Sequence, residues 1–351
     1  MIYNLKSVKD AQVQNKTVLL RVDMDVPIEN LLVKDDSRLN AWLPTLQFLL
    51  DNNASVIIVG HLGRPEEKDE DLTLLPVVKW LGQKLQIQNP NTTIKIGEFD
   101  GWQLSNKISL LENIRFYPEE EKNDPQFVQK LSSLAQIFVN DAFATAHRAH
   151  ASTEGVTHFL PSFAGLRVLE EVKVLSEILE NPKRPLCVII GGAKIETKLP
   201  LVKKMCQFAD HVLVGGEIAE NSTILSEIDK EKAPDCSLLV ADLNEIKTDI
   251  TPESLQKFIQ AAGNCQTIVW NGPMGLIPNP DNPNQSTFYL AKMLSESNAY
   301  KVVGGGDTVG FLKEHNLLDK FSFVSTGGGA MLEFLSGEKL PGLVALEQNR
   351  F

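Results

Sequence analysis

Residues 16–27 read KTVLLRVDMDVP, a short apolar run followed by two aspartates that flank a methionine. A run of this kind that ends in polar side chains is typical of a buried strand whose carboxyl end reaches solvent. If the extended backbone continues, Arg21, Asp23 and Asp25 lie on one face. Such a pair of acids can hold a metal, move a proton or accept hydrogen bonds from a hydroxylated ligand, and this stretch alone leaves all three possibilities open.

The same pattern recurs along the whole chain. Short runs rich in Val and Ile end in polar or glycine residues at 17–23, 55–61, 137–143, 186–192, 211–216, 267–272, 301–307 and 321–329. Helix-length segments separate them, for example residues 39–53 and 118–135. The alternation predicts an α/β fold of parallel sheets covered by helices. In such sheets ligands bind at the carboxyl ends of the strands.

The length of 351 residues predicts two domains, each able to bury a core. Near mid-chain the segment GLRVLEEVKVLSEILENP (165–182) has a helical apolar period and ends at Asn181-Pro182. It is either a helix that joins the two domains or an ordinary crossover helix. A loop rich in Pro, Asn and Asp at 277–287 is expected to be exposed.

Composition excludes several classes of protein. Apolar residues make up 43% and charged residues 23%, as in ordinary soluble proteins, and no apolar run approaches a membrane span. The net charge of −11 argues against general nucleic-acid binding, although local basic residues can still bind an anionic small molecule. The four cysteines lack short paired spacings and the first ten residues lack a signal peptide, so we expect reduced thiols in a cytoplasmic protein.

The strand ends of the first half are rich in basic residues. Arg38 follows the first strand, and His61, Arg64, Arg115, His147 and Arg148 follow later ones. Arginine presents forked donors to phosphate or carboxylate, so their convergence predicts a site for a small polyanion. Any one of these arginines taken alone is better explained by a surface salt bridge, and only their shared location after strands favours the anion site. A metal site at His147 and His150 is disfavoured because Arg148 lies between them and no third ligand is near.

The strand ends of the second half are rich in glycine: IIGGAK (189–194), LVGGE (213–217), VGGGDT (303–308) and STGGGA (325–330). Glycines let a backbone approach a ligand, and helix N-termini attract phosphate, so four such turns predict a nucleotide site. Lys194 and Lys198 are four residues apart after the first turn and are expected to share a helix face toward phosphate. Asp307 either reaches a magnesium ion or caps a helix. A polyanion site and a nucleotide site together predict phosphoryl transfer with domain closure.

These stretches resemble the phosphoglycerate kinase family in order and over nearly the whole chain. The resemblance rests on RVDxxVP, HLGRP, LLENIRFYPEEE, VNDAFATAHRAHAST, GGAKIETK, WNGPMG, GGGDT and STGGGAMLEFLSGEKLPG. It implies a Mg²⁺-dependent, reversible transfer between 1,3-bisphosphoglycerate and ADP that gives 3-phosphoglycerate and ATP. It also implies a cytoplasmic monomer with two Rossmann-like lobes: a triose-phosphate lobe of residues 1–165 plus 336–351, an interdomain helix at 166–181, and a nucleotide lobe at 182–335.

The resemblance also implies roles for individual residues. It assigns the substrate to Asp23, Asp25, Arg38, His61, Arg64, Arg115 and Arg148. It assigns catalysis to Arg38, Lys194, Lys198, Gly328 and Gly329. It assigns the nucleotide to Gly191, Gly192, Lys198, Gly215, Gly216, Asn271, Pro273, Gly305, Gly306, Asp307 and Thr308, and the metal to Asp307. Within this set Asp23 accepts a hydrogen bond from the glycerate hydroxyl. A proton shuttle by the two aspartates is disfavoured, because the transfer needs no general base.

The chain departs from the family pattern at several positions. Asp25 stands where the family has asparagine, and it is expected to weaken substrate binding by repelling an anion. Thr197 replaces an aspartate between the paired lysines, and Pro278 replaces a glutamate that accepts from the ribose. The segment 216–270 is shorter than in the family by a few tens of residues. Two alternatives follow from these departures: a non-catalytic relative that binds a phosphorylated ligand or a protein, and an acyl-phosphate kinase for another acid.

Overall fold

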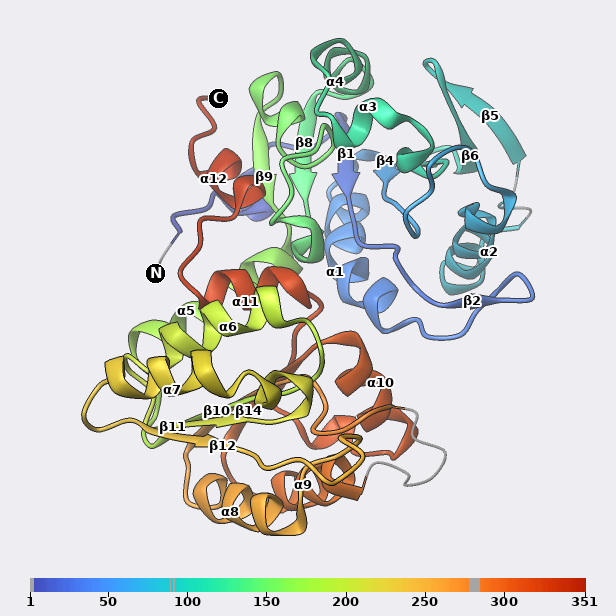
Figure 1. Cartoon of the computed structure of the whole chain (residues 1–351). Coiled ribbons are helices and arrows are strands. Elements are labelled where there is room, and N and C mark those ends of the chain that lie inside the picture. The colour runs from blue at the N-terminus through green and yellow to red at the C-terminus, as the bar shows by residue number, and fades with distance from the viewer. Residues whose placement is uncertain (1–2, 89, 91, 278–284) are drawn as a thin grey trace. The chain divides into compact units, whose positions relative to one another are not determined.

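The computed structural model describes residues 3–88, 90, 92–277 and 285–351. The chain forms two compact units (Figure 1). The first unit comprises residues 1–173 and 339–351, and the second unit comprises residues 174–338. The boundary falls within helix α5 (Leu166–Glu180), the helix expected at 165–182.

The first unit is built on a sheet whose described strands run in the order β5-β6-β7-β4-β1-β8-β9. The pairs β1·β4, β1·β8, β4·β7 and β8·β9 are parallel, whereas β5·β6 and β6·β7 are antiparallel. The strands are β1 (Thr17–Arg21), β4 (Ser55–Val59), β5 (Thr92–Ile96), β6 (Phe99–Ser105), β7 (Ile108–Leu111), β8 (Ile137–Asn140) and β9 (Ser162–Ala164). A short hairpin pairs β2 (Ile28–Glu29) with β3 (Leu32–Val33).

Helices of the first unit supply the other half of its core. They are α1 (Ser37–Asp51), α2 (Leu75–Lys84), α3 (Pro118–Glu121), α4 (Pro125–Ser132) and α12 (Pro341–Glu347). Leu39, Trp42 and Leu46 of α1 are buried against strand residues such as Val18 and Leu20, because they recur at the helical period. The expected single segment at 118–135 is wrong: it forms two helices, because Asp124 caps α4 and Pro125 cannot continue α3.

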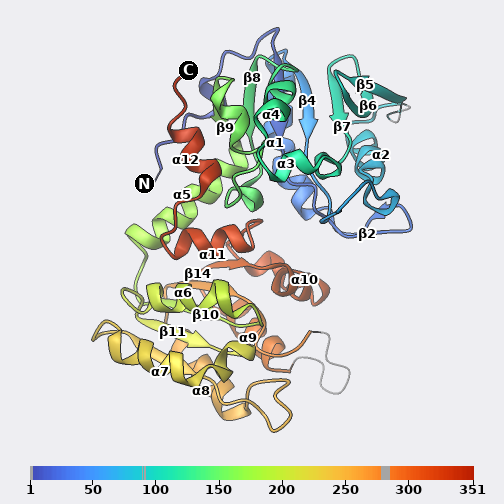
Figure 2. The same cartoon turned by 45° about the horizontal axis from the view of Figure 1, so that its top comes forward.

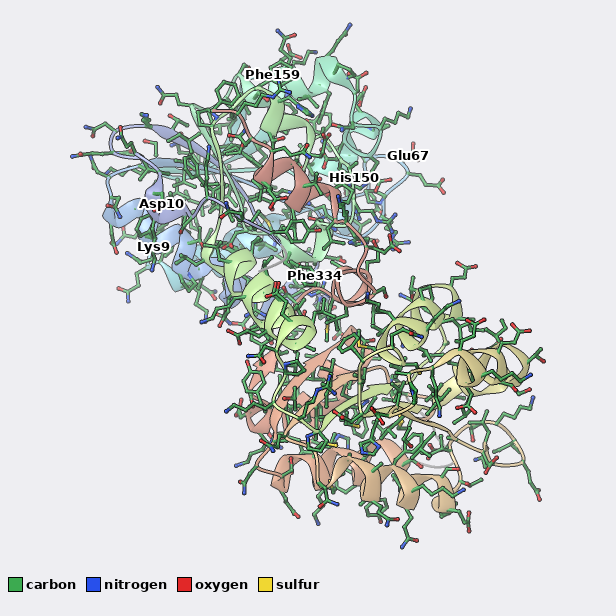
Figure 3. All side chains as sticks on the ribbon, turned by 90° about the vertical axis from the view of Figure 1, so that its left-hand side faces the viewer. Lys9, Asp10, Glu67, His150, Phe159 and Phe334 are labelled. Atoms are coloured by element: carbon green, nitrogen blue, oxygen red, sulfur yellow. The ribbon has the colours of Figure 1, made fainter. Side chains whose placement is uncertain are left out.

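The C-terminal residues belong to the first unit. The Leu340 amide donates to the Tyr3 hydroxyl at 2.8 Å, and the Asn349 side chain bonds the Thr157 and Leu160 carbonyls. Figure 2 shows α12 beside β9. The N-terminal and C-terminal segments therefore contact each other within the first unit. Lys9 and Asp10, labelled in Figure 3, lie at the surface of this unit.

The second unit contains a parallel sheet with the described order β12-β11-β10-β13-β14-β15. Its strands are β10 (Leu186–Ile190), β11 (His211–Val214), β12 (Ser237–Val240), β13 (Thr267–Asn271), β14 (Tyr300–Gly304) and β15 (Phe323–Val324). Its helices are α6 (Ile195–Met205), α7 (Ser222–Glu231), α8 (Pro252–Ala262), α9 (Gln285–Glu296), α10 (Gly306–Glu314) and α11 (Gly329–Leu335).

Helices cover both faces of this second sheet. Figure 1 shows α6, α7 and α11 on one face and α8 and α9 on the other. Because alternate strand residues point to opposite faces, the central strands β10 and β13 are buried along their whole length, and Ile189 and Trp270 pack with α8 and α9. The α/β expectation is confirmed in both units, and every predicted strand ends where a loop with polar or glycine residues begins.

Candidate active site

The two aspartates of the opening stretch follow β1 rather than belonging to it. Because β1 ends at Arg21, strand alternation does not extend through Asp25 as expected. Instead, the Asp25 amide donates to Asp23 Oδ1 at 3.2 Å, which makes a local side-chain turn. Asp23 is buried and its Oδ2 has no hydrogen-bond partner in the described part of the chain, whereas Asp25 is half exposed. Burial raises the pKa of Asp23.

Arg38 lies in the first turn of α1, over both aspartates. Its Nη1 donates to the Asp25 carbonyl at 2.8 Å, and its Nε lies 3.7 Å from Asp23 Oδ2. Asp25 Oδ1 in turn accepts from the Gly63 amide at 3.0 Å. Arg38 therefore keeps free donors on a partly exposed guanidinium beside an unsatisfied carboxylate oxygen.

The other basic residues of the first unit gather near the same strand ends. His61 is buried directly after β4, and burial together with Arg21, Arg115, His150 and Arg38 lowers its pKa well below the usual value. Arg115 donates to the Gly63 carbonyl at 2.7 Å and pairs with Glu121 at 3.0 Å. The predicted convergence of Arg38, Arg115 and His61 is thus present.

Arg64 and Arg148 complete this basic cluster from exposed positions. Arg64 makes no ion pair with any residue that the structure describes, and Arg148 Nε lies 3.1 Å from His147 Nε2. Burial and the neighbouring arginines lower the pKa values of His147 and His150 (labelled in Figure 3) to about 4. Neutral histidines beside Arg64 and Arg148, for which the described residues provide no carboxylate partner, make a site that attracts anions and repels metal cations.

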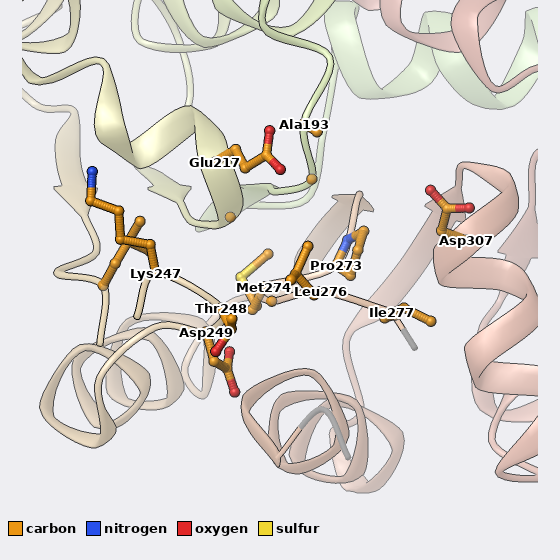
Figure 4. Close-up of a pocket in the computed structure, with 14 residues that line it drawn as sticks. Ala193, Glu217, Lys247, Thr248, Asp249, Pro273, Met274, Leu276, Ile277 and Asp307 are labelled. Carbon is orange, nitrogen blue, oxygen red and sulfur yellow. The ribbon is translucent and has the colours of Figure 1, made fainter. Parts of the chain in front are cut away.

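In the second unit a pocket lies at the carboxyl ends of the strands. Figure 4 shows it between Lys247 and Asp307, with Glu217, Met274 and Pro273 along its walls. Gly192 and Gly216 also line it, whereas Gly191, Gly215 and Asn271 lie beside it. Both lining glycines have positive φ, and a Cβ on Gly216 would approach the Gly192 nitrogen to 2.4 Å, so the two turns require glycine.

The amides of these glycine turns are already used by the protein. Gly191 and Gly192 donate to the Asn271 and Pro273 carbonyls, and Gly215 and Gly216 donate to Ile190 and Met274. These four N–H groups are therefore unavailable to phosphate. Because these glycines lack side chains, the two turns lie close together and present a flat backbone surface to the pocket, against which a planar ligand can pack.

The two lysines after the first glycine turn differ from the expectation. Lys194 is exposed at the N-cap and so precedes α6, whereas Lys198 is 6% exposed inside it. Lys194 is therefore the N-cap and not, as expected, a residue of the helix, although its charge contributes to the lowered pKa of Lys198. The Lys198 ammonium donates to the Gly191 carbonyl, and burial lowers its pKa to about 8.

Asn271, the last residue of β13, and Thr308, in the first turn of α10, are both buried. The Thr308 hydroxyl accepts from the Gly272 amide at 3.0 Å, whereas Asn271 Nδ2 has no hydrogen-bond partner among the residues that the structure describes. Asp307 is exposed in the first turn of α10 and faces the pocket. The capping alternative for Asp307 is wrong, because Gly305 is the N-cap and Gly306 begins the helix.

The remaining predicted residues are placed as follows. Gly328 is the N-cap of α11 and Gly329 is its first residue. Thr197 lies in α6, where its hydroxyl bonds the Lys194 carbonyl at 3.2 Å. Pro278 and most of the 277–287 loop lie outside the described residues.

No cluster of three or more His, Cys, Asp or Glu side chains suited to a metal is found in the described part of the chain. A single exposed carboxylate such as Asp307 fits Mg²⁺, which keeps most of its ligands from water and phosphate. Among the described helices, none combines the length and apolar character that a membrane crossing requires.

Sequence reasoning missed a buried charged network beneath the basic cluster. Arg21 and Glu120 are at most 1% exposed and meet through Ser152. Glu120 stands in the run PEEE, which is typical of a solvated helix start, so charge alone gave no sign of its burial. The signal available was Arg21 itself, an arginine at the end of an otherwise apolar strand.

Comparison with known proteins supports the arrangement. A sequence model of the family "Phosphoglycerate kinase" matches residues 8–234 and 230–338. A phosphoglycerate kinase from Dictyoglomus turgidum is 38% identical over 386 positions, covering 97% of each chain. The cytosolic phosphoglycerate kinase 3 of Arabidopsis thaliana is 37% identical and covers 97% of this chain and 98% of its own. Both alignments are longer than the 351 residues present here, so these relatives carry residues that this chain lacks.

Solved structures give the same result. The phosphoglycerate kinase of Coxiella burnetii superposes with a TM-score of 0.80 at 32% identity, covering 98% of this chain and 99% of its own. That of Pyrococcus horikoshii superposes with a TM-score of 0.82 at 28% identity, covering 99% and 100%. From the motifs, the parallel sheets and these matches, the chain belongs to the phosphoglycerate kinase family.

Proposed function

We propose that the chain is an active phosphoglycerate kinase that transfers a phosphoryl group reversibly between 1,3-bisphosphoglycerate and ADP, with Mg²⁺. The observation that carries the proposal is Lys198. Its ammonium is buried and makes no ion pair with any residue that the structure describes. A buried unpaired charge is costly, so its retention at the head of a helix beside a pocket points to an anionic ligand.

The first unit is proposed to bind the triose. Arg64, Arg115 and Arg148 are placed to bind a phosphate, since arginine matches its oxygens with paired donors. Asp23 Oδ2 is buried without a partner and can accept the glycerate hydroxyl. Arg38 then neutralises the carboxylate that receives or donates the phosphoryl group.

The second unit is proposed to bind the nucleotide. The base rests against the glycine turns, while Asn271 Nδ2 and the first-turn amides of α10 face the phosphates. Asp307 would hold Mg²⁺, which neutralises charge on the phosphate oxygens when bound. The mechanism needs no general base, because the attacking group is a carboxylate or a phosphate oxygen that is already ionised.

Transfer depends on positive charge around the moving phosphoryl group. Lys198 and Arg38 supply that charge, and Lys194, Gly328 and Gly329 assist at the nucleotide side. In-line transfer requires the two ligands to meet, so we propose that the units close during turnover. Scattering measurements with both substrates bound test this proposal, because closure lowers the radius of gyration.

The departures from the family are proposed to alter affinity and not the reaction. Thr197 in place of an acid leaves Lys194 and Lys198 without that neighbouring charge, and Asp25 adds a negative charge to the substrate site. We further propose a cytoplasmic monomer, which light scattering after gel filtration tests directly. A non-catalytic role gains no support from the relatives reported above, all of which are named as kinases.

The experiment is a coupled assay with ATP, Mg²⁺ and 3-phosphoglycerate, run beside Lys198→Ala. Turnover that this variant loses supports the kinase. Absence of turnover with 3-phosphoglycerate still binding by calorimetry would instead favour a ligand-binding relative. Parallel assays with other phosphorylated acids would detect an acyl-phosphate kinase of different specificity.

A further inference from the structure

One contact beneath the basic cluster fixes the chemistry of a predicted substrate residue. Arg21, the last residue of β1, places its Nη2 3.0 Å from His61 Nδ1, and both side chains are buried. The same guanidinium donates through Nε to the Ser152 hydroxyl at 2.9 Å and through Nη1 to the Val22 carbonyl.

The direction of the Arg21–His61 hydrogen bond is determined by chemistry. A guanidinium has only donors, so His61 Nδ1 must be the acceptor and cannot carry a proton. Arg21 stays charged at neutral pH, because burial lowers its pKa only to about 10. His61 is consequently neutral, with its single ring proton on Nε2.

A buried counter-charge holds Arg21 in this position. Glu120 is fully buried and accepts both the Ser152 hydroxyl at 2.5 Å and the Ser152 amide at 2.9 Å. Ser152 therefore receives a hydrogen bond from Arg21 and passes one to Glu120. Ser152 thus links the Arg21 guanidinium to the Glu120 carboxylate through Nε, and Nη2 of Arg21 remains available to His61.

The free nitrogen of His61 is left for a ligand. Among the described residues no side chain or backbone group bonds His61 Nε2, while Arg38 and Arg115 influence the ring electrostatically from nearby. We propose that Arg21 is a positioning residue that holds His61 as the Nε2–H tautomer, so that this histidine serves the phosphorylated substrate as a neutral hydrogen-bond donor and not as a cation. The role in binding rests on the proposed function, but the tautomer does not.

Nitrogen NMR of the ligand-free protein tests the tautomer directly. We expect the ¹⁵N spectrum of His61, assigned by its loss in His61→Gln, to show one protonated and one unprotonated ring nitrogen, with the proton on Nε2. This pattern should persist below the ordinary histidine pKa of ~6.5. An imidazolium with both nitrogens protonated at neutral pH, or an Nδ1–H tautomer, would overturn the proposal. If the expected spectrum were found in a protein without kinase activity, the proposed function would be refuted and the tautomer assignment would stand.

A matched pair of variants tests the consequence for binding. His61→Gln can place an amide donor where Nε2 stands, whereas the shorter amide of His61→Asn reaches only the position of Nδ1, where its oxygen can accept from Arg21. We expect His61→Gln to keep KM for 3-phosphoglycerate within about threefold and His61→Asn to raise it roughly tenfold, the effect of one lost hydrogen bond to a charged group. Equal losses in both variants would show that a cation is required.

Arg21→Lys tests the positioning residue itself. Lysine keeps the charge near Glu120 but lacks the fork that reaches Nδ1 and Ser152 together. In the folded variant, verified by circular dichroism, we expect a mixture of His61 tautomers and a higher KM with a smaller change in kcat. An unchanged Nε2–H population in Arg21→Lys would show that Arg21 does not determine the tautomer of His61. If Arg21→Lys does not fold, the spectrum and the Gln and Asn pair decide the question.

Discussion

Arg38 Nε lies 3.7 Å from Asp23 Oδ2, too far for a hydrogen bond, and this buried oxygen has no other partner among the described residues. Burying an acceptor without a partner is costly, and we therefore propose that Asp23 Oδ2 accepts a hydrogen bond from a ligand hydroxyl. Asp23→Ala should therefore raise KM for 3-phosphoglycerate roughly tenfold or more.

An analogue without the 2-hydroxyl separates this effect from general damage. Its inhibition constant should be the same in the parent and in Asp23→Ala, because it never used the carboxylate. If Asp23→Ala weakened the analogue and the substrate equally, Asp23 would be a structural residue and not a hydroxyl acceptor.

Asp25→Asn should improve substrate binding. The amide keeps an oxygen for the Gly63 amide, now accepted at 3.0 Å, and removes a negative charge near an anionic ligand. Because the side chain is 44% exposed, the gain is small, about two- to fivefold in KM for 3-phosphoglycerate. Asp51→Asn, at the opposite end of α1, is the matched control that loses the same charge away from the site. An unchanged KM in Asp25→Asn would refute the repulsion.

Lys198 should impose an alkaline limit on catalysis. Burial lowers its pKa to about 8, so the ammonium loses its proton as pH rises through that value in the free enzyme. Since kcat/KM reports the free enzyme, kcat/KM for ATP should fall above about pH 8. Lys198→Arg stays charged over this whole pH range. We expect it to be less active than the parent, and its kcat/KM should not fall between about pH 8 and about pH 10. A parent profile that stays flat to pH 10 would contradict the assigned charge.

The ionised carboxylate of Asp141 should lower the stability of the first unit at neutral pH, relative to an uncharged side chain at the same position. The carboxylate caps α5 by accepting from the Arg167 amide at 2.8 Å and the Val168 amide at 3.1 Å. Burial nevertheless raises its pKa from 3.8 to about 6, so the folded state binds more protons than the unfolded state between those values. Its contribution to the free energy of unfolding therefore falls as pH rises through that window.

Asp141→Asn should keep the cap and remove this pH dependence. At pH 7 we expect it to be more stable than the parent by roughly 1–3 kcal/mol, and near pH 4 to differ little. Asp141→Ala should lose stability at both pH values, because the amides lose their acceptor. Urea unfolding followed by tryptophan fluorescence measures these differences. If the parent and Asp141→Asn were equally stable at every pH, burial of the ionised Asp141 carboxylate would not lower the free energy of unfolding.

The sequence predicted the strands well because their runs are short, apolar and closed by polar or glycine residues. It also predicted which side chains meet, since the carboxyl ends of parallel strands share an edge. Arg38, His61 and Arg115 gather near one such edge, and Asp307 faces the pocket beside another.

Local backbone detail could not be predicted from the same patterns. Three glycines in a row at 304–306 give no sign of which one caps α10, so the capping alternative for Asp307 was wrong. The start of α6 depends on the turn at Gly191 and Gly192, and this placed Lys194 outside the helix. The buried pair of Arg21 and Glu120 depends on tertiary packing that no local period reveals.

The coupled assay with ATP, Mg²⁺ and 3-phosphoglycerate tests the central claim most directly. We expect turnover in the parent and a loss of at least about a hundredfold in Lys198→Ala, because this variant lacks one positive charge beside the moving phosphoryl group. The Asp51→Asn control should retain full activity. Absence of turnover in the parent would contradict the claim that this chain is a working phosphoglycerate kinase, and turnover that Lys198→Ala retains would contradict the role proposed for Lys198.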